Sequence, residues 1–281
     1  MRNLDDLQAA ACSQLGLTVK RSLKSGGQKT VALVDQSGQE RVLKLVQVGA
    51  SDPTALERSR REFGLLADTK HPNVVEVRSG LEVLADTDSS IDGAFWLEEY
   101  LDGEDLGDLV GTKWTFDDVG AMGLAVAAGV GALHEQKVIH RDLSANNIRR
   151  LVDGRYKVMD PGFAKHTLRS GITVGGQPGT PGFMTPEHLQ AYSGPTPASD
   201  VFAIGALMYL AATGTPPIPY LGDEIDYVNR LVVAKHTPLG TLRTDFPTPL
   251  SEVIERCLHP QPVRRYRNAK RLREALVEVT S

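Results

Sequence analysis

Apolar and polar residues alternate through the first third of the chain, a pattern typical of half-buried strands. From Leu17 to Val48 the alternation is interrupted at two glycine-containing turn signals, Ser25-Gly26-Gly27 and Gln36-Ser37-Gly38. Such turns join neighbouring strands, so this segment predicts three antiparallel strands. Two further strands are predicted near Val74–Leu84 and Ala94–Tyr100. The first third is therefore predicted to form a small antiparallel sheet.

A helical pattern replaces the alternation in the rest of the chain. One charged amphipathic helix is predicted within the first third, with Asp52 as its N-cap and Pro53 at its first position, and it should end before His71-Pro72. This placement is expected because an acidic cap followed by proline starts helices and the residue before a proline tends to end them. After Tyr100, apolar residues recur at helical spacing over Val119–His134, Ala198–Thr213, Leu250–Leu258 and Asn268–Val277. The whole pattern predicts an α+β fold with a helical second part.

Residues 1–16 precede the predicted sheet and allow two interpretations. Leucines at positions 4, 7 and 15 lie between capping residues at both ends, Asn3 and Gly16. They favour a short amphipathic helix that docks on the sheet. A frayed leader without a function is the second interpretation.

Composition narrows the class of protein. The chain has 281 residues, of which 41% are hydrophobic and 23% charged, enough to bury a core of one or two lobes. Cys12 and Cys257 match no metal-ligand or redox spacing, so we expect two packing residues in a reducing compartment. The net charge of -4 gives no reason to expect a nucleic acid or an anionic membrane as partner.

A membrane segment and a secretory leader are not expected. No apolar run approaches the roughly 20 residues needed to cross a bilayer. Asp5 and Asp6 lie where a leader would carry its apolar core. We therefore expect a cytoplasmic protein.

Polar residues suited to phosphoryl transfer are concentrated between positions 140 and 187. The sequence reads H-R-D-L-S-A-N-N at 140–147, D-P-G at 160–162 and G-T-P-G-F-M-T-P-E at 179–187. Transfer of a phosphoryl group to a hydroxyl needs a carboxylate near the acceptor, oxygen ligands for Mg²⁺ and a platform for the acceptor. Asp142, Asn147 with Asp160, and the segment 179–187 can supply these three parts.

These motifs resemble those of the eukaryotic-type (Hanks-type) protein-serine/threonine kinases, H-R-D-L-x-x-x-N, D-F-G and A-P-E, and a bacterial member is one interpretation. The match extends from about Leu17 to the end of the chain. It implies the two-lobed kinase fold: a leader or short helix (1–16), a nucleotide-binding lobe of antiparallel sheet and one main helix (17–101), and a mostly helical catalytic lobe (102–281).

The resemblance also implies roles for single residues. Asp142 would orient the attacking hydroxyl and accept its proton, while Asn147 and Asp160 would hold Mg²⁺. Lys44, in Val42-Leu43-Lys44, would contact the α and β phosphates of ATP, and Glu62 would hold that lysine in place. ATP and Mg²⁺ are thus the expected cofactors, with a protein as the phosphate acceptor.

The glycine-rich loop of the family is only partly kept. In Lys24-Ser25-Gly26-Gly27-Gln28-Lys29, Gly26 and Gly27 would let backbone N–H groups approach the phosphates. Lys24 and Lys29 stand in place of the outer glycines. They either supply charge to the phosphates or point into water.

The segment 96–105 resembles the connection between lobes that binds the nucleoside. Glu99 and Leu101 would contact adenine through backbone groups, and Asp105 would bind the ribose hydroxyls. Glu98 would then lie at the back of the adenine pocket and narrow or polarise it. The other interpretation of Glu98 is a partly exposed strand end.

The resemblance further implies a substrate platform with Thr180 and Glu187, the latter paired with Arg265, and a buried Asp200 that braces the catalytic loop. Arg141 suggests control by phosphorylation within Thr167–Gly179, because such arginines pair with an added phosphate. The candidate phosphorylation sites are Ser170 and Thr173. A constitutive loop with exposed hydroxyls is the alternative.

Two residues depart from the family pattern. Ser144 replaces the lysine that neutralises the transferred phosphate, so either Lys24 or Lys29 compensates or the rate is low. Pro161 replaces the aromatic residue of D-F-G and restricts Asp160 before it. The proline implies either less freedom for the metal-binding loop or a weaker link between Glu62 and the site.

The favoured function is an ATP-dependent protein-serine/threonine kinase that autophosphorylates in its activation loop. Two alternatives stay open at this point. The departures allow a pseudokinase that serves as a nucleotide-binding or scaffold module. A serine after the catalytic aspartate also allows a small-molecule kinase of similar fold, although Thr180, Glu187 and Arg265 favour a protein acceptor.

Overall fold

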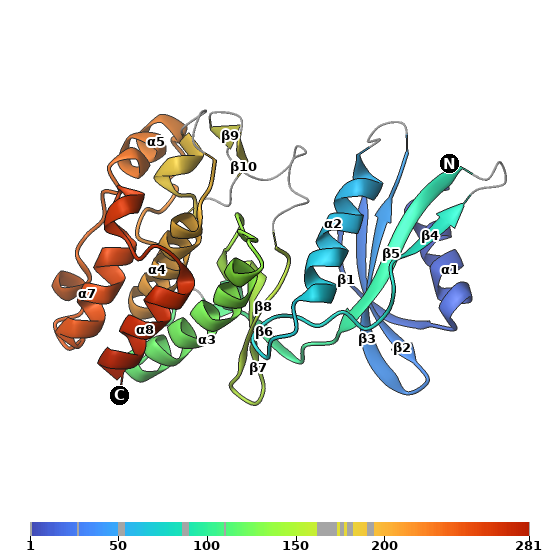
Figure 1. Cartoon of the computed structure of the whole chain (residues 1–281), viewed down its shortest axis with the longest axis horizontal. Helices are drawn as coiled ribbons and strands as arrows, with labels where there is room; N and C mark the ends of the chain where they lie inside the picture. The colour runs from blue at the N-terminus through green and yellow to red at the C-terminus, as the bar shows by residue number, and fades with distance from the viewer. Residues whose placement is uncertain are drawn as a thin grey trace. The chain divides into compact units, whose positions relative to one another are not determined.

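The computed structural model describes residues 2–26, 28–49, 54–85, 90–109, 111–161, 173–174, 177–178, 182–189 and 194–280. The chain divides into two compact units. The first comprises Met1–Lys70 and Val75–Asp102, and the second comprises His71–Val74 and Gly103–Ser281. Figure 1 shows the sheet-rich elements of the first unit in blue and cyan and the helices of the second in green to red.

The first unit contains a five-stranded antiparallel sheet in the order β1-β2-β3-β5-β4. β1 (Thr18–Gly26), β2 (Lys29–Gln36) and β3 (Gln39–Gln47) confirm the three predicted strands. β2 and β3 are joined through Ser37 and Gly38, with φ of 54° and 84°. Two positive φ angles in a two-residue connection match the twist of the strands that it joins.

The fourth predicted strand is much shorter than the apolar pattern indicated. β5 (Ile91–Glu99) confirms the strand predicted near 94–100, but β4 covers only Glu82–Ala85. Upstream of β4, Val77 forms an isolated bridge to Glu98, whereas Val74 bridges to Val158 of the second unit, to which Val74 itself belongs. The prediction of one strand over 74–84 was wrong because this apolar run is divided between two units.

Helix α1 (Leu4–Leu15) packs on the sheet of the first unit and confirms the helical interpretation of residues 1–16. The Asn3 side chain accepts a hydrogen bond from the Asp6 N–H at its start, and Gly16 ends it with φ of 63°. Leu7 and Ala11 are fully buried in one cluster with the inward residues of β2, β3 and β5. The interpretation as a frayed leader was therefore wrong.

Helix α2 (Ala55–Asp68) also contacts β3 and β5. It ends before His71-Pro72, as predicted, while its predicted start at Asp52-Pro53 lies outside the described residues. Ser59, Glu62 and Leu66 are its buried positions one turn apart, together with Ala55. This spacing turns Glu62 inward, toward the sheet.

The helices of the second unit confirm the predicted pattern. α3 (Phe116–Glu135), α4 (Pro197–Thr213), α7 (Thr248–Cys257) and α8 (Ala269–Thr280) correspond to the four predicted helices. They share one core cluster, in which α4 is buried along nearly its whole length. The periodicity missed α5 (Glu224–Val232) and α6 (Leu239–Leu242), which are too short for a repeating signal.

The expectation that no apolar run approaches 20 residues was wrong for helix α3. By length and composition this helix is apolar enough to cross a bilayer. Half of its residues are buried in the core of the second unit, and their spacing of three and four residues places them on one broad face of the helix. Its apolar character is accounted for by packing against α4 and α8.

A three-stranded sheet in the second unit was not predicted. β6 (Gly103–Asp105), β7 (Ile148–Leu151) and β8 (Tyr156–Val158) pair in the order β6-β7-β8. Gly103 has φ of 157°, and a Cβ there would lie 2.0 Å from the Arg150 carbonyl oxygen. Only glycine therefore fits this close approach of two strands.

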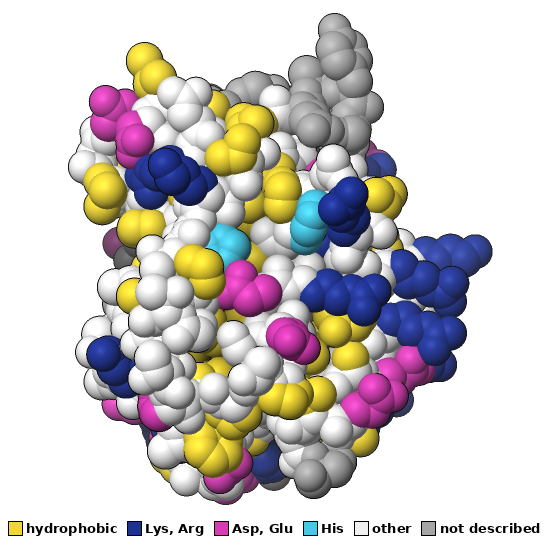
Figure 2. Space-filling view, turned by 90° about the vertical axis from the view of Figure 1, so that its left-hand side faces the viewer, with side chains coloured by type: hydrophobic (Ala, Val, Ile, Leu, Met, Phe, Trp, Pro, Cys, Tyr) yellow, Lys and Arg dark blue, Asp and Glu magenta, His cyan; other side chains and the backbone are white. Residues whose placement is uncertain are grey.

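The remaining elements of the second unit are short. They are the 3₁₀ helices η1 (Leu106–Leu109), η2 (Ala145–Asn147), η3 (Pro186–Leu189) and η4 (Pro262–Arg264), and the two-residue strands β9 (Thr173–Val174) and β10 (Gln177–Pro178). Figure 2 shows the end of this unit, where hydrophobic side chains are scattered among polar ones and Lys and Arg side chains gather at one side.

Candidate active site

The β7–β8 hairpin positions the two predicted metal ligands, Asn147 and Asp160. Asn147 immediately precedes β7, and Met159-Asp160 immediately follow β8. Because Ile148 pairs with Val158, these flanking residues meet at the open end of the hairpin. The Met159 N–H donates to the Asn147 carbonyl oxygen, with N and O 2.8 Å apart. The backbone of the strand pair thus brings the segments of both predicted ligands together.

Asn147 is bonded to Asp142. Its Nδ2 donates to the Asp142 carbonyl oxygen at 2.7 Å and to the Asp142 carboxylate at 3.2 Å. Asn147 is buried, while Asp142 is half-buried. Both hydrogen bonds use the amide nitrogen, so the amide oxygen Oδ1 is the atom that a hard cation could contact.

Asp200 on α4 braces the catalytic loop, as predicted. Its carboxylate accepts hydrogen bonds from the backbone N–H groups of His140 at 2.8 Å and Arg141 at 3.1 Å. His134 at the end of α3 lies 2.8 Å from the same carboxylate. The brace holds Arg141 with φ of 67°, a left-handed backbone that side chains other than glycine rarely adopt.

Asp160 also has a left-handed backbone, with φ of 48°. The proline that follows it, Pro161, is buried and does not keep Asp160 at negative φ. Such a backbone conformation costs about 1–3 kcal/mol and persists only where the surrounding contacts hold it in place. Neighbouring contacts do so here, because the Met159 carbonyl is 2.9 Å from His140 Nε2.

The predicted pair of Glu187 and Arg265 is present. Arg265 donates from both terminal nitrogens to the Glu187 carboxylate, at 2.8 Å and 2.9 Å, and Ser199 donates to the same carboxylate at 2.9 Å. Burial raises the pKa of Glu187, but the Arg265 hydrogen bonds and charge outweigh burial and leave this pKa lowered. Glu187 is therefore ionised, and both of its carboxylate oxygens accept hydrogen bonds. Thr180 lies outside the described residues.

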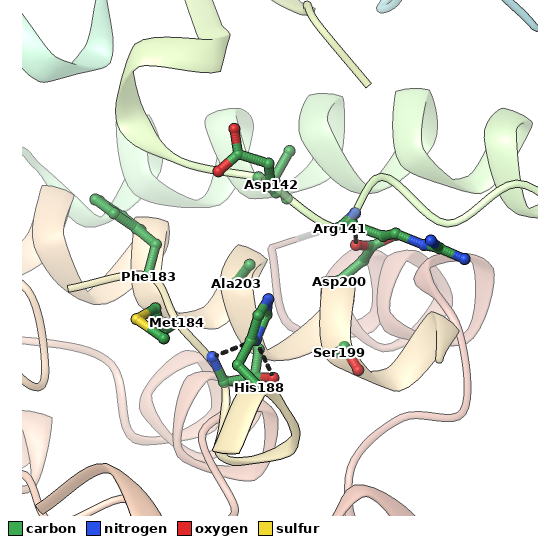
Figure 3. Close-up of a pocket in the computed structure, with 10 residues that line it drawn as sticks. Arg141, Asp142, Phe183, Met184, His188, Ser199, Asp200 and Ala203 are labelled. Atoms are coloured by element: carbon green, nitrogen blue, oxygen red, sulfur yellow. Dashed lines mark hydrogen bonds between the residues drawn. The ribbon is translucent and has the colours of Figure 1, made fainter. Parts of the chain in front are cut away.

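A pocket beside Asp142 contains a histidine that the sequence analysis missed. Figure 3 shows Arg141 and Asp142 on one segment of this pocket, with His188 of η3 and Asp200 of α4 on others. His188 Nδ1 is 3.0 Å from the Thr185 N and 2.9 Å from the Thr185 hydroxyl. No local pattern distinguishes this histidine from an ordinary core residue, so it could not have been identified from sequence.

Four charged side chains meet in the first unit. The predicted pair of Lys44 and Glu62 has a separation of 3.9 Å, but Glu98 lies closer to Lys44, at 2.9 Å. Glu98 is buried, so the interpretation as a partly exposed strand end was wrong. Lys29 lies 3.4 Å from Glu62 and does not simply point into water. The side chain of Lys24 is outside the described residues.

The other predicted nucleotide contacts are distributed as follows. Gly26 is the last residue of β1 and pairs with Lys29, while Gly27 lies outside the described residues. Glu99 ends β5, and Leu101 is buried just after it. Asp105 lies on β6, where Arg149, its cross-strand neighbour, forms an ion pair with it at 2.8 Å. Arg149 had no recognisable sequence signal, because β6 is only three residues long.

The candidate phosphorylation sites cannot be placed in full. Ser170 lies outside the described residues. Thr173 starts β9, whose backbone pairs with β10. The side chain of Arg141, the predicted partner of an added phosphate, is exposed.

The first unit holds a buried lysine between carboxylates on a sheet. The second unit brings together an aspartate, an asparagine and a second aspartate. These two features are typical of the protein kinase catalytic domains. The family model described as "Protein kinase domain" matches residues 17–276. The chain therefore belongs to the protein kinase family.

Curated relatives agree with this membership. The chain is 28% identical to serine/threonine-protein kinase PknA of Mycobacterium tuberculosis over 93% of this chain and 60% of that protein. It is 30% identical to PknB of the same species, over 82% of this chain and 37% of that protein. A probable serine/threonine-protein kinase of Clostridium perfringens, CPE1738, is 27% identical over 77% of this chain and 31% of that protein. The chain thus spans about one third to three fifths of the length of these relatives.

A solved structure supports the fold. The kinase domain of Mycobacterium tuberculosis PknI matches with a TM-score of 0.68 and 23% identity, covering 94% of this chain and 96% of that one. At this identity the likeness is one of fold.

Proposed function

We propose that this chain is the catalytic domain of an ATP-dependent protein-serine/threonine kinase, which transfers the γ-phosphate of ATP to a protein hydroxyl. The observation that carries the proposal is the joined set Asp142–Asn147–Met159-Asp160, in which Asn147 is bonded to Asp142 through its side chain and to Met159 through its backbone. A carboxylate for the acceptor and oxygen ligands for Mg²⁺ are the parts that phosphoryl transfer needs.

The residues of the second unit fit a magnesium ion held jointly with a nucleotide. Within the described residues no cluster of three or more His, Cys, Asp or Glu side chains could hold a metal alone. Mg²⁺ is commonly bound by one or two protein oxygens together with substrate phosphates. Asn147 Oδ1 and the Asp160 carboxylate would be these ligands, and the ion would neutralise phosphate charge. Asp142 would orient the attacking hydroxyl and accept its proton.

The first unit would bind the nucleotide. Lys44 would contact the α and β phosphates and Glu62 would hold it, while Gly26 and Gly27 would offer backbone N–H groups. Glu99 and Leu101 would bind adenine through backbone groups. The ribose would be bound by Asp105, whose carboxylate is positioned by Arg149.

A protein acceptor is favoured over a small molecule. The buried pair of Glu187 and Arg265 fixes the platform segment that follows Thr180, and a rigid platform suits an extended peptide. The relatives PknA and PknB are both named as serine/threonine-protein kinases. Autophosphorylation at Ser170 or Thr173, read by Arg141, is part of the proposal. We place the domain in the cytoplasm, where Mg·ATP is supplied.

A phosphate-transfer assay tests the proposal. Purified chain is incubated with Mg·ATP and a generic basic protein, and incorporated phosphate is measured by mass spectrometry. Asp142→Ala should lower the rate by about 10²–10⁴-fold, because it removes the acid–base group. Asp160→Ala should abolish the Mg·ATP complex in calorimetry.

Asp153→Ala is the matched control. Asp153 is an exposed carboxylate of the same unit, paired with Arg155 on the surface, and its loss should leave the rate unchanged. Phosphate transfer that persists in Asp142→Ala would contradict the proposal. Binding of Mg·ATP without any transfer would favour a pseudokinase.

A further inference from the structure

The charged group of the first unit is built on one face of its sheet. Lys44 pairs directly with Trp96 across β3 and β5, and Glu98 lies two residues further along β5. Residues two apart share a face of a strand, so Lys44, Trp96 and Glu98 face the same way. Helix α2, which contacts β3 and β5, brings Glu62 to this face.

Burial makes these charges strongly dependent on one another. Lys44, Glu62 and Glu98 are each at most 4% exposed, and the Trp96 indole beside them is fully buried. The Nζ atoms of Lys29 and Lys44 each lie 6.0 Å from the Trp96 ring centroid. Water contributes little screening in such a place, so which carboxylate a lysine faces has a large electrostatic effect.

Distances rank Glu98 and Glu62 as partners of Lys44. Its Nζ lies 2.9 Å from Glu98 Oε1, a charge-assisted hydrogen bond, and 3.9 Å from Glu62 Oε1, beyond hydrogen-bond distance. The Trp96 indole N–H donates to the same Glu98 oxygen at 2.8 Å and fixes that carboxylate. Lys29, at 3.4 Å, provides Glu62 with a second cation. Of these two carboxylates, Glu98 is therefore the nearer partner of Lys44.

We propose that Glu98 is a positioning residue that competes with the nucleotide phosphates for Lys44. The inference rests on the proposed function, in which Lys44 contacts the phosphates while Glu62 holds it. In that arrangement ATP must draw Lys44 from Glu98 before the lysine serves the reaction. Glu98 therefore lowers the affinity for Mg·ATP.

Glu98→Gln tests this competition. Glutamine keeps the size of the side chain and an oxygen that accepts from both Trp96 and Lys44, but removes the negative charge. The Kd for Mg·ADP and the KM for ATP should fall by about tenfold, the factor expected for weakening one buried charge-assisted hydrogen bond. The KM for the protein substrate should not change.

Glu62→Gln is the matched control, because it changes the charge of the same cluster by the same amount. The proposal predicts opposite outcomes: tighter nucleotide binding in Glu98→Gln, and a lower kcat/KM in Glu62→Gln. Equal tightening in both variants would indicate a general effect of charge and overturn the proposal. An unchanged KM for ATP in a folded Glu98→Gln would also overturn it.

Trp96 provides an independent readout. In a Trp114→Phe background Trp96 is the one remaining tryptophan, since the chain has 2. Mg·ADP should change its emission as Lys44 leaves Glu98, and this change should be smaller in Glu98→Gln. An equal change in Trp96 emission with and without Glu98→Gln would contradict movement of Lys44.

Two further variants keep the test decisive. If Glu98→Gln fails to fold, Glu98→Asp keeps the charge but withdraws the carboxylate by about 1.5 Å. It should lower the KM for ATP in the same direction by a smaller factor, and an unchanged or higher KM would refute the competition. Lys44→Met separates the proposed function from the proposed competition. If Lys44→Met leaves Mg·ADP binding intact, the proposed role of Lys44 in nucleotide binding fails. If Lys44→Met weakens Mg·ADP binding but Glu98→Gln does not change it, only the competition is refuted.

Discussion

His188 connects the platform segment with the catalytic loop through an uncharged ring. Burial is the main cause of its lowered pKa, and a backbone hydrogen bond with Arg141 and the proximity of Glu187 oppose burial only in part. A neutral ring can accept at Nδ1 from Thr185. Protonation would remove that acceptor and place a charge in the pocket beside Asp142.

The lowered pKa predicts a loss of stability in acid. The unfolded chain takes up a proton at histidine near pH 6.5, whereas folded His188 resists it to lower pH, so the contribution is present above about pH 6.5 and lost as the pH falls. His188→Asn keeps an acceptor near Nδ1 but does not titrate. Urea unfolding should show a smaller loss of stability between pH 7.5 and 5 in this variant than in the wild type.

His236 is the control of opposite sign. Burial lowers its pKa, but the hydrogen bonds with Glu255 and with the Ala234 backbone outweigh burial, so the pKa is raised. Its contribution is present below about pH 6.5 and lost as the pH rises through the folded pKa. His236→Gln should therefore alter the pH profile on the alkaline side. A His188→Asn profile identical to that of the wild type would contradict the assignment.

Helix α1 is attached to the sheet by a polar clamp as well as by its leucines. The Arg2 side chain donates to both oxygens of the buried Asp92 carboxylate, at 3.0 Å and 2.7 Å, and to the Ala85 carbonyl at 2.8 Å. Hydrogen bonds from Arg2 are the main cause of the lowered pKa of Asp92. The element before the matched kinase segment is thus an integral part of the first unit.

Removal of the clamp should destabilise the first unit. Arg2→Ala leaves the Asp92 carboxylate buried with lost partners, at a cost of about 1–3 kcal/mol. Thermal unfolding should therefore begin at lower temperature. Lys20→Ala removes an exposed ion pair with Glu40 on the same sheet and should have no measurable effect. Equal melting of both variants would show that α1 is held by its apolar face alone.

Element prediction succeeded where periodicity was long and failed where pairing partners decided the outcome. The four long helices of the second unit and the strands β1–β3 were predictable because each shows several repeats of one pattern. β4 and β6 were not, since three or four residues carry no period and their extent depends on which strand they meet. The turn at Ser37-Gly38 was predictable because few residues adopt positive φ.

The pair of Glu187 and Arg265 joins positions 78 residues apart and closes the second unit around α4. Arg265 also donates to the carbonyl oxygens of His259, Pro260 and Ala198. Its side chain has no exposed surface, and that of Glu187 is only 4% exposed. Five acceptor oxygens thus depend on one buried guanidinium.

Breaking the pair should be severe. Glu187→Ala leaves a buried, unpaired arginine and should cost about 3–5 kcal/mol in the free energy of unfolding. Arg264→Ala, at the exposed neighbouring position, should cost little. Urea unfolding of the two variants measures the difference. If their midpoints agree, the pair does not hold this unit together.

The candidate site was predictable as a set of residues because each member has a fixed chemical task at a fixed order in the chain. Asp142, Asn147 and Asp160 could be named, as could the pairing of Glu187 with Arg265 and the bracing by Asp200. Their distances could not, because they depend on the β7–β8 hairpin and on α4.

Local order in the chain was enough to predict the four long helices of the second unit and the first three strands. It also predicted the capped helix at residues 4–15, as one of two interpretations, and it named the candidate catalytic groups. Tertiary structure alone decided that Glu98, rather than Glu62, is the nearer acceptor of Lys44, and that His188 and Arg149 contact the site residues. The reason is physical: periodicity and turn chemistry act between neighbours in sequence, whereas a buried charge selects its partner by distance across strands and helices that only folding brings together.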